Sequence, residues 1–474
     1  MNFYFEAAKV LDKLDSKKGS IKGIITTIAE KDRKRTAALV IETLKYKPVL
    51  NEVLDAAKLL KEERKITSRN LALLLIHDLL LANGIQAGDG PVKQAVLRHK
   101  TRLHSEFTRI KIKRGAKTNS ELAQTDDSRA AQIPRYVRVN RNCWTIEEAI
   151  KTFVSRGYEL GDPLACNKAF AKDEHIPDLL AFHPHVQFVD DALYKEGKII
   201  LQDKASCFPA YILAPLEDEG SSVIDATAAP GNKTSHLSAL MGNKGKLFAF
   251  ERDRKRFSTL KMMLSKARCR NVEAVSADFL TTDPTDAKYS KVTHIMLDPS
   301  CSGSGIVNRM DHLLESDKQK DEDQDRLAKL ASFQLMMIRH AMKFPSAERI
   351  AYSTCSIHAI ENEGVVRQAL DAPEALEGQF TLAPREQVLP AWRRRGLDEE
   401  MNNADDAQTL VRCSPDEDGT NGFFVCLFVK KADIGSSSNT TMNKRPIEDE
   451  PVDAARNKRR KRRKKGANSI GELP

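Results

Sequence analysis

The sequence contains no long hydrophobic run. Its 474 residues include no uninterrupted apolar stretch near the roughly 18 residues that a helix needs to cross a bilayer. The most apolar stretch, from Leu71 to Ala82, is interrupted by His77 and Asp78. The first residues include Glu6 and show no apolar segment of the kind that secretory signals have. We therefore expect neither a membrane-spanning helix nor a secretory signal.

Cysteine is sparse and is not arranged for metal binding. The eight cysteines form no CxxC pair and no short-spaced cluster. This favours free thiols in a reducing compartment and predicts no metal site. Aromatic residues make up only 6%, while 41% of the residues are hydrophobic and 30% are charged. This composition excludes a collagen, a coiled-coil rod and a wholly disordered chain, and the length predicts two to four domains of roughly 100–200 residues each.

Positive charge is concentrated near the end of the chain. The net charge is +10, and the segment from Lys444 to Lys465 holds eleven basic and four acidic residues. Residues 433–474 are rich in polar and basic residues, so we expect a disordered tail. The pair Lys444-Arg445, twelve residues and the basic run 458–465 are typical of a bipartite nuclear import signal. A polyelectrolyte tail that binds RNA is the alternative; the two roles are compatible, and we favour the nuclear address.

The first 118 residues are expected to form a helical region. The apolar stretch described above fits one buried helix, which Thr67 or Ser68 caps and Asn83-Gly84 ends. Residues 98–117 contain eight Lys or Arg and a single acid. This pattern fits a solvated helix face and a phosphate-binding stripe equally well. Residues 119–133 are expected to form a linker.

Residues 134–204 are expected to form a small α+β module. The alternating residues after Pro134 predict a strand, and Thr145 should cap a helix that extends to Arg156. Two further strands are predicted at Val186–Val189 and Lys198–Asp203.

Residues 205–432 alternate between strand-like and helix-like segments. This order predicts a parallel sheet with helices on both faces, and the last two strands, separated by a short acidic turn, should form an antiparallel hairpin. Five parallel strands and a terminal hairpin are the layout of Rossmann-like methyltransferases. The predicted strands are Ser222–Ala226, Lys246–Glu251, Val272–Ala277, His294–Leu297, Arg349–Ser353, Thr409–Cys413 and Gly422–Lys430.

A turn of small residues follows the first of these strands. The segment DATAAPGNKT (225–234) leads from strand to helix, and small residues let a ligand approach the backbone closely. Glu251, twenty residues after Gly231, ends the next strand and is suited to accept hydrogen bonds from ribose hydroxyls. The turn is neither a Walker loop nor a GxGxxG loop, and a tight structural turn is the alternative.

Four acids come at the ends of predicted parallel strands: Asp225, Glu251, Asp278 and Asp298. Ligands of such sheets bind at the carboxyl ends of the strands. One acid alone is compatible with a helix cap, whereas four together indicate a binding site.

Two cysteines also follow different strands. Cys301 lies in LDPSCSGSG (297–305) and Cys355 in YSTCS (352–356). Thiols there suit methylation of a pyrimidine carbon, because C5 of cytosine becomes sufficiently nucleophilic only after a thiolate adds to C6. That role requires a lowered thiol pKa, and the pattern does not choose between the two thiols. The other cysteines are expected to be buried small hydrophobes: Cys143, Cys166, Cys207, Cys269, Cys413 and Cys426.

The segments DATAAPGNKT, LDPSCSGSG and YSTCS resemble the signature segments of the NSUN, or Sun-domain, family of RNA cytosine-5 methyltransferases. LQDKAS (201–206) and IENE (360–363) resemble its flanking segments, and the likeness covers roughly residues 134–430. The helical N-terminal region, PGNKT and PSCSGSG are most similar to the fifth NSUN type. This resemblance implies a Rossmann-like class I methyltransferase domain, S-adenosylmethionine as cofactor, large-subunit ribosomal RNA as partner, and a nuclear, nucleolar location.

The resemblance also implies roles for individual residues. Cys355 would be the nucleophile and Cys301 would assist product release, with Asp298 contacting the cofactor or the target base. Asn232 stands where many members have glycine, and asparagine tolerates left-handed backbone angles. The residues that would line the cofactor are Thr227, Ala228, Ala229, Pro230, Gly231, Asn232, Lys233, Glu251, Arg256, Asp278 and Asp298.

Residues 134–200 correspond to the RNA-binding module of that family. Arg135, Arg138 and Arg141 are candidate phosphate contacts, and solvated surface arginines are an equal alternative. A transfer-RNA methyltransferase shares all of the chemistry and is a second reading. A catalytically silent ribosome-assembly factor that uses the same fold to bind RNA is the strongest alternative of a different class. The intact residues Cys301, Cys355, Lys233 and Asp298 argue against it. The oligomeric state is not predicted.

Overall fold

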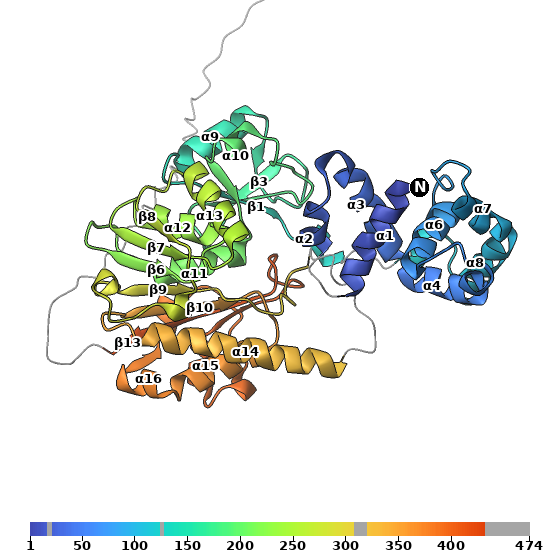
Figure 1. The fold of residues 1–474 in the computed structure, drawn as a ribbon. Helices are drawn as coiled ribbons and strands as arrows, with labels where there is room; N and C mark the ends of the chain where they lie inside the picture. Colours follow the sequence, from blue (N-terminus) through green and yellow to red (C-terminus); the bar gives the residue numbers. More distant parts are fainter. Residues whose placement is uncertain (17–20, 124–127, 308–319, 432–474) are drawn as a thin grey trace, which may run out of the picture. The chain divides into compact units, whose positions relative to one another are not determined.

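The computed structural model describes residues 1–16, 21–123, 128–307 and 320–431 (Figure 1). The basic tail and its predicted import signal lie outside these residues. Among the described helices, none is both long enough and apolar enough to cross a membrane.

The first part of the described chain is built from helices around α6. Ser68 caps α6 by accepting a hydrogen bond from the Leu71 N–H at 3.0 Å, and every residue from Asn70 to Leu80 is buried. A helix that is buried on all sides is the centre of a bundle, so the predicted buried helix is confirmed. The helices are α1 (Asn2–Asp15), α2 (Ile21–Thr26), α3 (Glu30–Lys45), α4 (Lys47–Ala56), α5 (Leu59–Glu62), α6 (Arg69–Leu81), α7 (Pro91–Arg98) and α8 (Lys100–Lys113).

The basic segment 98–117 lies mainly on α8. Several of its cations already have carboxylate partners within the same region, which favours the solvated, paired helix face over a phosphate-binding stripe. These ion pairs are Arg98–Glu63, Arg102–Glu62, Arg109–Glu106 and Arg114–Glu52.

The small module is a five-stranded sheet with an aromatic core. Its strand order is β2-β3-β4-β1-β5, and the Thr145 hydroxyl caps α9 (Ile146–Ser155) as predicted. Phe153 of α9 packs against Phe170 and Phe182 of the sheet. The strands are β1 (Arg135–Val139), β2 (Glu159–Leu160), β3 (Ala169–Lys172), β4 (Leu179–Phe182) and β5 (Ile199–Leu201), and a short helix α10 spans Ala192–Lys195.

The strand predicted at Val186–Val189 is wrong. This segment is irregular, and Phe188 is buried there because its ring packs against Phe153 and Phe182. Burial of one aromatic side chain produced the apolar pattern that suggested a strand. Strands β3 and β4, of four residues each, were not predicted.

The larger sheet has the predicted parallel core and antiparallel hairpin. The order is β11-β13-β10-β9-β6-β7-β8, with β12 paired to β13. Neighbours from β10 through β8 are parallel, and β13 runs antiparallel to β10, β11 and β12. The strands are β6 (Ser222–Asp225), β7 (Lys246–Phe250), β8 (Val272–Val275), β9 (His294–Leu297), β10 (Arg349–Thr354), β11 (Phe380–Leu382), β12 (Val411–Cys413) and β13 (Phe423–Lys430).

Helices cover both faces of this sheet (Figure 1). Because strand side chains alternate, Ile224 and Ile295 enter one core together with α14 and α15, whereas Val223 and Met296 enter the other with α11 and α12. The helices are α11 (Lys204–Leu213), α12 (Asn232–Leu240), α13 (Arg254–Lys266), α14 (Lys320–Met342), α15 (Glu363–Leu370), α16 (Pro373–Glu377) and α17 (Ala404–Thr409).

Arg138 on β1 is a structural residue rather than a phosphate contact. Its side chain is fully buried, which lowers its pKa, yet a guanidinium keeps its charge in proteins. It donates to Gln202 Oε1 at 2.8 Å, to Ser235 Oγ at 2.8 Å and to the Asn232 carbonyl at 3.2 Å. The prediction for Arg138 is therefore wrong, because the side chain holds the first turn of α12 and does not reach solvent.

We expect Arg138→Ala to destabilise the protein. The change leaves three acceptors, two of them buried, without their charged donor, a loss of about 3 kcal/mol. For a domain of about 150–250 residues, that loss corresponds to a fall in melting temperature of roughly 6–12 °C. Differential scanning calorimetry measures this fall. Lys172→Ala, at the exposed end of β3, is the control and should have almost no effect. An Arg138→Ala protein that melts with the control would contradict the structural role.

Candidate active site

The turn between β6 and α12 is shaped by Gly231. Gly231 has a φ of 115° and precedes the first residue of α12. A Cβ there would come within 3.3 Å of Leu260 and Met263, so both conformation and space require glycine. Asn232 is already helical and donates to the Leu201 carbonyl at 3.2 Å, so it needs no left-handed angle. The free N–H groups of the α12 N-terminus thus lie at the carboxyl ends of the strands, where an anionic group is stabilised.

Asp225, the last residue of β6, ties this turn together. The side chain is buried, accepts from the Thr227 N–H at 3.2 Å and accepts from the Thr234 hydroxyl at 2.7 Å. Burial raises the pKa of Asp225 to about 6, because its neutral hydrogen-bond donors do not fully replace water. Asp225 therefore shapes the turn and has no charged partner among these contacts.

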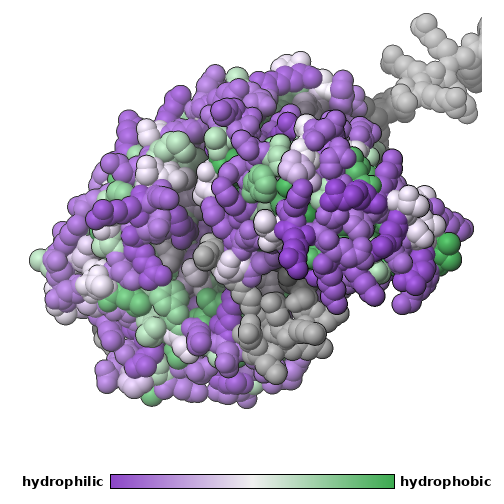
Figure 2. All heavy atoms as spheres, turned by 45° about the vertical axis from the view of Figure 1, so that its right-hand side comes forward, coloured by the Kyte–Doolittle hydropathy of each residue, from purple (hydrophilic) through white to green (hydrophobic). Residues whose placement is uncertain are grey.

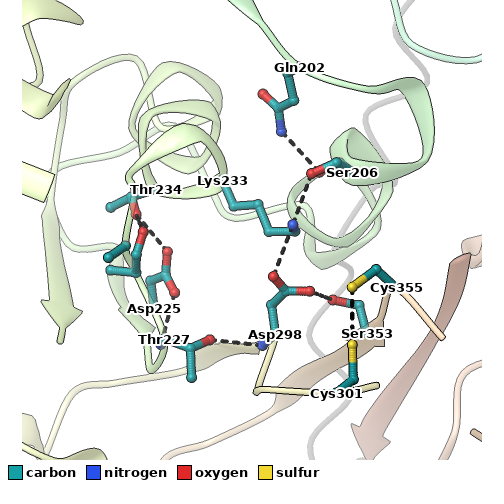
Figure 3. Close-up of polar contacts among 12 residues, drawn as sticks. Gln202, Ser206, Asp225, Thr227, Lys233, Thr234, Asp298, Cys301, Ser353 and Cys355 are labelled. Atoms are coloured by element: carbon teal, nitrogen blue, oxygen red, sulfur yellow. Dashed lines mark hydrogen bonds and ion pairs between the residues drawn. The ribbon is translucent and has the colours of Figure 1, made fainter. Parts of the chain in front are cut away.

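An ion pair between Lys233 and Asp298 joins the turn to the next part of the sheet (Figure 3). Lys233 Nζ lies 3.0 Å from Asp298 Oδ2 and donates to Ser206 Oγ at 2.9 Å. Asp298 Oδ1 accepts from the Ser353 hydroxyl at 2.8 Å, and the Asp298 N–H donates to Thr227 Oγ1 at 3.0 Å. Burial works to lower the pKa of Lys233, but the neighbouring Asp298 carboxylate outweighs it and the pKa is raised. Lys233 is therefore held as a cation.

The two predicted thiols are neighbours. Cys301 follows β9 and Cys355 directly follows β10, and these strands are adjacent and parallel. The two sulfur atoms lie 3.0 Å apart, neither cysteine forms a disulfide, and both are partly exposed. Figure 3 shows them beside Asp298, on the side away from Asp225. Two adjacent strands thus bring two thiols, 54 residues apart in the chain, into one site.

The thiols differ in their electrostatic surroundings. The hydrogen bond to Cys355, followed by burial and the nearby Asp298 and Glu361 carboxylates, raises the pKa of Cys301. The lowered pKa that the sequence analysis requires of the reacting thiol is therefore not found at Cys301. The Lys233 ammonium, in contrast, interacts favourably with negative charge on Cys355. Nearby carboxylates thus disfavour a thiolate at Cys301, and the nearby ammonium favours one at Cys355.

The remaining predicted cofactor residues lie at the same sheet edge. Glu251 follows β7 and is buried, with its Oε2 3.5 Å from Arg256 Nη1. Arg256 also donates to the Ala229 carbonyl at 2.8 Å, which holds the turn. Asp278 lies after β8, where it caps a short helical turn and pairs with Arg252 at 3.1 Å. The structure therefore brings all four strand-end acids to one edge.

Family models match successive parts of the chain. The description "16S rRNA methyltransferase RsmB/F" covers residues 210–429. The N-terminal and ferredoxin-like domains of "NOL1/NOP2/Sun domain family member 5" cover residues 34–123 and 133–202. A 25S rRNA (cytosine-C(5))-methyltransferase of Schizosaccharomyces pombe is 44% identical over 430 residues, 90% of both chains. A 28S rRNA (cytosine-C(5))-methyltransferase of Mus musculus is 39% identical over 479 residues, 98% of both chains.

The chain belongs to the NSUN family. The resemblance inferred from its sequence motifs is thereby confirmed. A solved methyltransferase homologue from Pyrococcus horikoshii is 21% identical, with a TM-score of 0.50, and covers 79% of this chain and 99% of that one. This likeness shows a shared fold, and the predicted Rossmann-like class I architecture is confirmed.

Several residues of this NSUN site carried no prediction. Ser206 and Ser353 hold the two ends of the Lys233–Asp298 pair, and Phe423 places its ring 5.5 Å from Lys233 Nζ. Ser206 lies in the LQDKAS segment and Ser353 in YSTCS, so the motifs contained them. Their roles depend on contacts across the sheet, which motif spacing does not encode.

The six other cysteines do not all behave alike. Cys207, Cys413 and Cys426 are buried, as expected of small hydrophobes, while Cys143 and Cys269 are only partly buried. Cys166 is exposed, so the buried reading is wrong for it. Over the described ranges, no group of three or more His, Cys, Asp or Glu side chains is arranged to hold a metal ion.

We expect the wild-type protein to lose stability as the pH rises and Asp225 loses its proton. The substitution Asp225→Asn should remove this loss. The folded-state pKa, about 6, lies above the ordinary 3.8, so the folded chain binds this proton more tightly. The resulting stabilisation is complete below about pH 4 and is lost as the pH rises through the folded pKa. Asparagine mimics the protonated side chain and still accepts from Thr227. The melting temperature of the variant relative to wild type should therefore rise between about pH 4 and pH 7.

Thermal melts across that pH range measure the effect. Asp190→Asn, at a fully exposed side chain, serves as the matched control and should show no such trend. The opposite trend would contradict the assignment of Asp225 as a buried, proton-binding group. In that case the melting temperature of wild type would rise relative to that of Asp225→Asn as the pH increased from about 4 to 7.

Proposed function

We propose that this protein is an S-adenosylmethionine-dependent methyltransferase that forms 5-methylcytosine in large-subunit ribosomal RNA. The observation that carries the proposal is the pair of cysteine thiols, 3.0 Å apart, beside the Lys233–Asp298 ion pair. Membership of the NSUN family supports the reaction class, since its relatives are named cytosine-C(5) methyltransferases.

Cys355 is the proposed nucleophile. Its thiolate adds to C6 of the target cytosine, and the electron pair of the C5–C6 double bond makes C5 nucleophilic toward the methyl donor. The Asp298 and Glu361 carboxylates disfavour a thiolate at Cys301, whereas the Lys233 ammonium favours one at Cys355, which supports Cys355 as the attacking sulfur. This electrostatic difference supports the division of labour that the family resemblance implies. Cys301 then assists release, in which C5 loses its proton and the C6–sulfur bond breaks to return the Cys355 thiolate.

Asp298 is proposed to fix the positions of the cofactor-binding turn and the two thiols relative to one another. Its carboxylate is shared between Lys233 and Ser353, and Ser353 lies two residues before Cys355. Asp298 itself lies three residues before Cys301. One carboxylate therefore restrains the cofactor turn and both thiol-bearing segments, and we assign it the contact to cofactor or target base.

The side chains at the sheet edge fit S-adenosylmethionine, which supplies an activated methyl group when bound. Lys233 is a cation suited to the amino-acid carboxylate, and the N-terminus of α12 favours the same charge. Glu251 Oε2 has only a long ion pair at 3.5 Å, so it retains capacity to accept ribose hydroxyls. We assign the turn from Thr227 to Lys233, together with Glu251, Arg256 and Asp278, to cofactor binding.

Ribosomal RNA is the proposed substrate class because the fungal and mouse relatives are named for 25S and 28S rRNA. The target cytidine must be unpaired or flipped from its stack for Cys355 to reach C6. We assign residues 1–118 to a helical domain, 119–133 to a linker, 134–204 to an RNA-binding module, 205–432 to the methyltransferase domain and 433–474 to a basic tail. That tail and the substrate class support a nuclear, nucleolar location.

Bisulfite mapping of 5-methylcytosine tests this function. Cells without the chain should lose one large-subunit rRNA site, and wild-type protein should restore it. Cys355→Ala should not restore the site, because addition to C6 is lost; Cys166→Ala, at an exposed thiol, is the matched control. Loss of a transfer-RNA site instead would keep the proposed chemistry and identify the protein as a transfer-RNA methyltransferase. Rescue by Cys355→Ala, or defective ribosomes with no lost site, would favour the catalytically silent assembly factor.

A further inference from the structure

Glu361 is a buried acid beside the thiols to which the mechanism above gives no role. It ends a short helical turn (Ala359–Glu361) after β10, and its side chain has no exposed surface. Oε1 accepts from the Ser302 N–H at 2.9 Å and from Gln334 Nε2 at 3.0 Å. Oε2 is buried and has no hydrogen-bond partner in the described part of the chain. Both donors to this carboxylate are neutral.

The contacts of Glu361 converge on the segment that carries Cys301. Ser302, whose N–H it binds, directly follows Cys301 in the chain. Gln334 of α14 binds Glu361 and also donates to the Ser300 carbonyl at 3.1 Å, so both sides of Cys301 are held. The Tyr352 hydroxyl fixes the backbone by donating to the Glu361 carbonyl at 2.6 Å. Glu361 and Gln334 thus hold the residues on both sides of Cys301 in place.

The neighbouring acid Glu363 shows what a structural carboxylate looks like in this region. Glu363 is equally buried, but Arg412 binds both of its oxygens at 2.6 Å. A buried carboxylate without a cation or a full set of donors is costly, and a glutamine of the same shape would avoid that cost. The unpaired charge of Glu361, placed beside a reactive thiol pair, therefore indicates a use for the charge itself.

We propose that Glu361 is a positioning residue that clamps the Cys301 loop and, through its negative charge, keeps the shared proton of the thiol pair on Cys301. A carboxylate near one sulfur disfavours a thiolate there, and the only other sulfur of the pair is Cys355. Glu361 is among the groups that raise the pKa of Cys301, behind the hydrogen bond to Cys355 and burial. The inference rests on the proposed function, because it explains which of the two thiols attacks C6.

Competitive alkylation of the full-length protein tests this role without RNA. A limiting amount of iodoacetamide, followed by peptide mass spectrometry, gives the ratio of modification at Cys355 to modification at Cys301. In wild type Cys355 should dominate. Glu361→Gln preserves the hydrogen bond to Ser302 but removes the charge, and it should lower the ratio by about tenfold, the effect of one pKa unit on thiolate population. Glu361→Asp should restore much of the wild-type ratio.

Glu363→Gln is the matched control. It should lower the melting temperature, because Arg412 loses its carboxylate, while leaving the alkylation ratio unchanged. A folded Glu361→Gln protein with the wild-type ratio would overturn the proposal, as would the same change of ratio in Glu363→Gln. The failure of the proposed function is a separate result, because it appears as absence of methyl transfer by wild type, whatever the ratio of the two thiols.

Discussion

The ion pair between Lys233 and Asp298 connects the turn before α12 with the two segments that carry the thiols. Lys233 belongs to the first turn of α12, which follows the glycine-shaped loop, and Asp298 directly follows strand β9. Through the Ser353 hydroxyl the same carboxylate reaches β10, whose next residues carry Cys355. A cofactor turn and two thiols are thereby fixed relative to one another by a single partly buried carboxylate, in a setting where charged hydrogen bonds are strong.

The parallel sheet makes this convergence possible. Strands β6, β9 and β10 are adjacent and run in the same direction, so their carboxyl ends meet although the residues are far apart in the chain. The backbone of the loop that carries Cys301 also packs directly against the connection between β12 and β13. Gly305 and Gly422 lie so near that the Gly422 N–H donates to the Gly305 carbonyl at 2.8 Å, and a Cβ at Gly305 would collide with Gly422.

Much of this arrangement was predictable because it rests on local patterns. The parallel strands other than β8 are mostly buried, and an acid or a cysteine lies at the end of each parallel strand or shortly after it, so the sheet edge was expected to hold a site. Arg138 and Val186–Val189 were misjudged for the opposite reason: an alternating pattern does not reveal that an arginine points into the first turn of α12, or that one phenylalanine is buried from an irregular segment. Contacts across elements, such as Ser206 with Lys233 and Glu361 with Ser302, have no local signal at all.

The central claim is that Cys355 bonds to the target base and that Cys301 is needed only later. The most direct measurement is the site of covalent attachment in the two single variants, Cys301→Ala and Cys355→Ala, each incubated with S-adenosylmethionine and substrate RNA. The account predicts a slowly migrating protein–RNA adduct on a denaturing gel for Cys301→Ala only, with peptide mass spectrometry locating the nucleotide on Cys355. An adduct formed by Cys355→Ala and attached to Cys301 would contradict it.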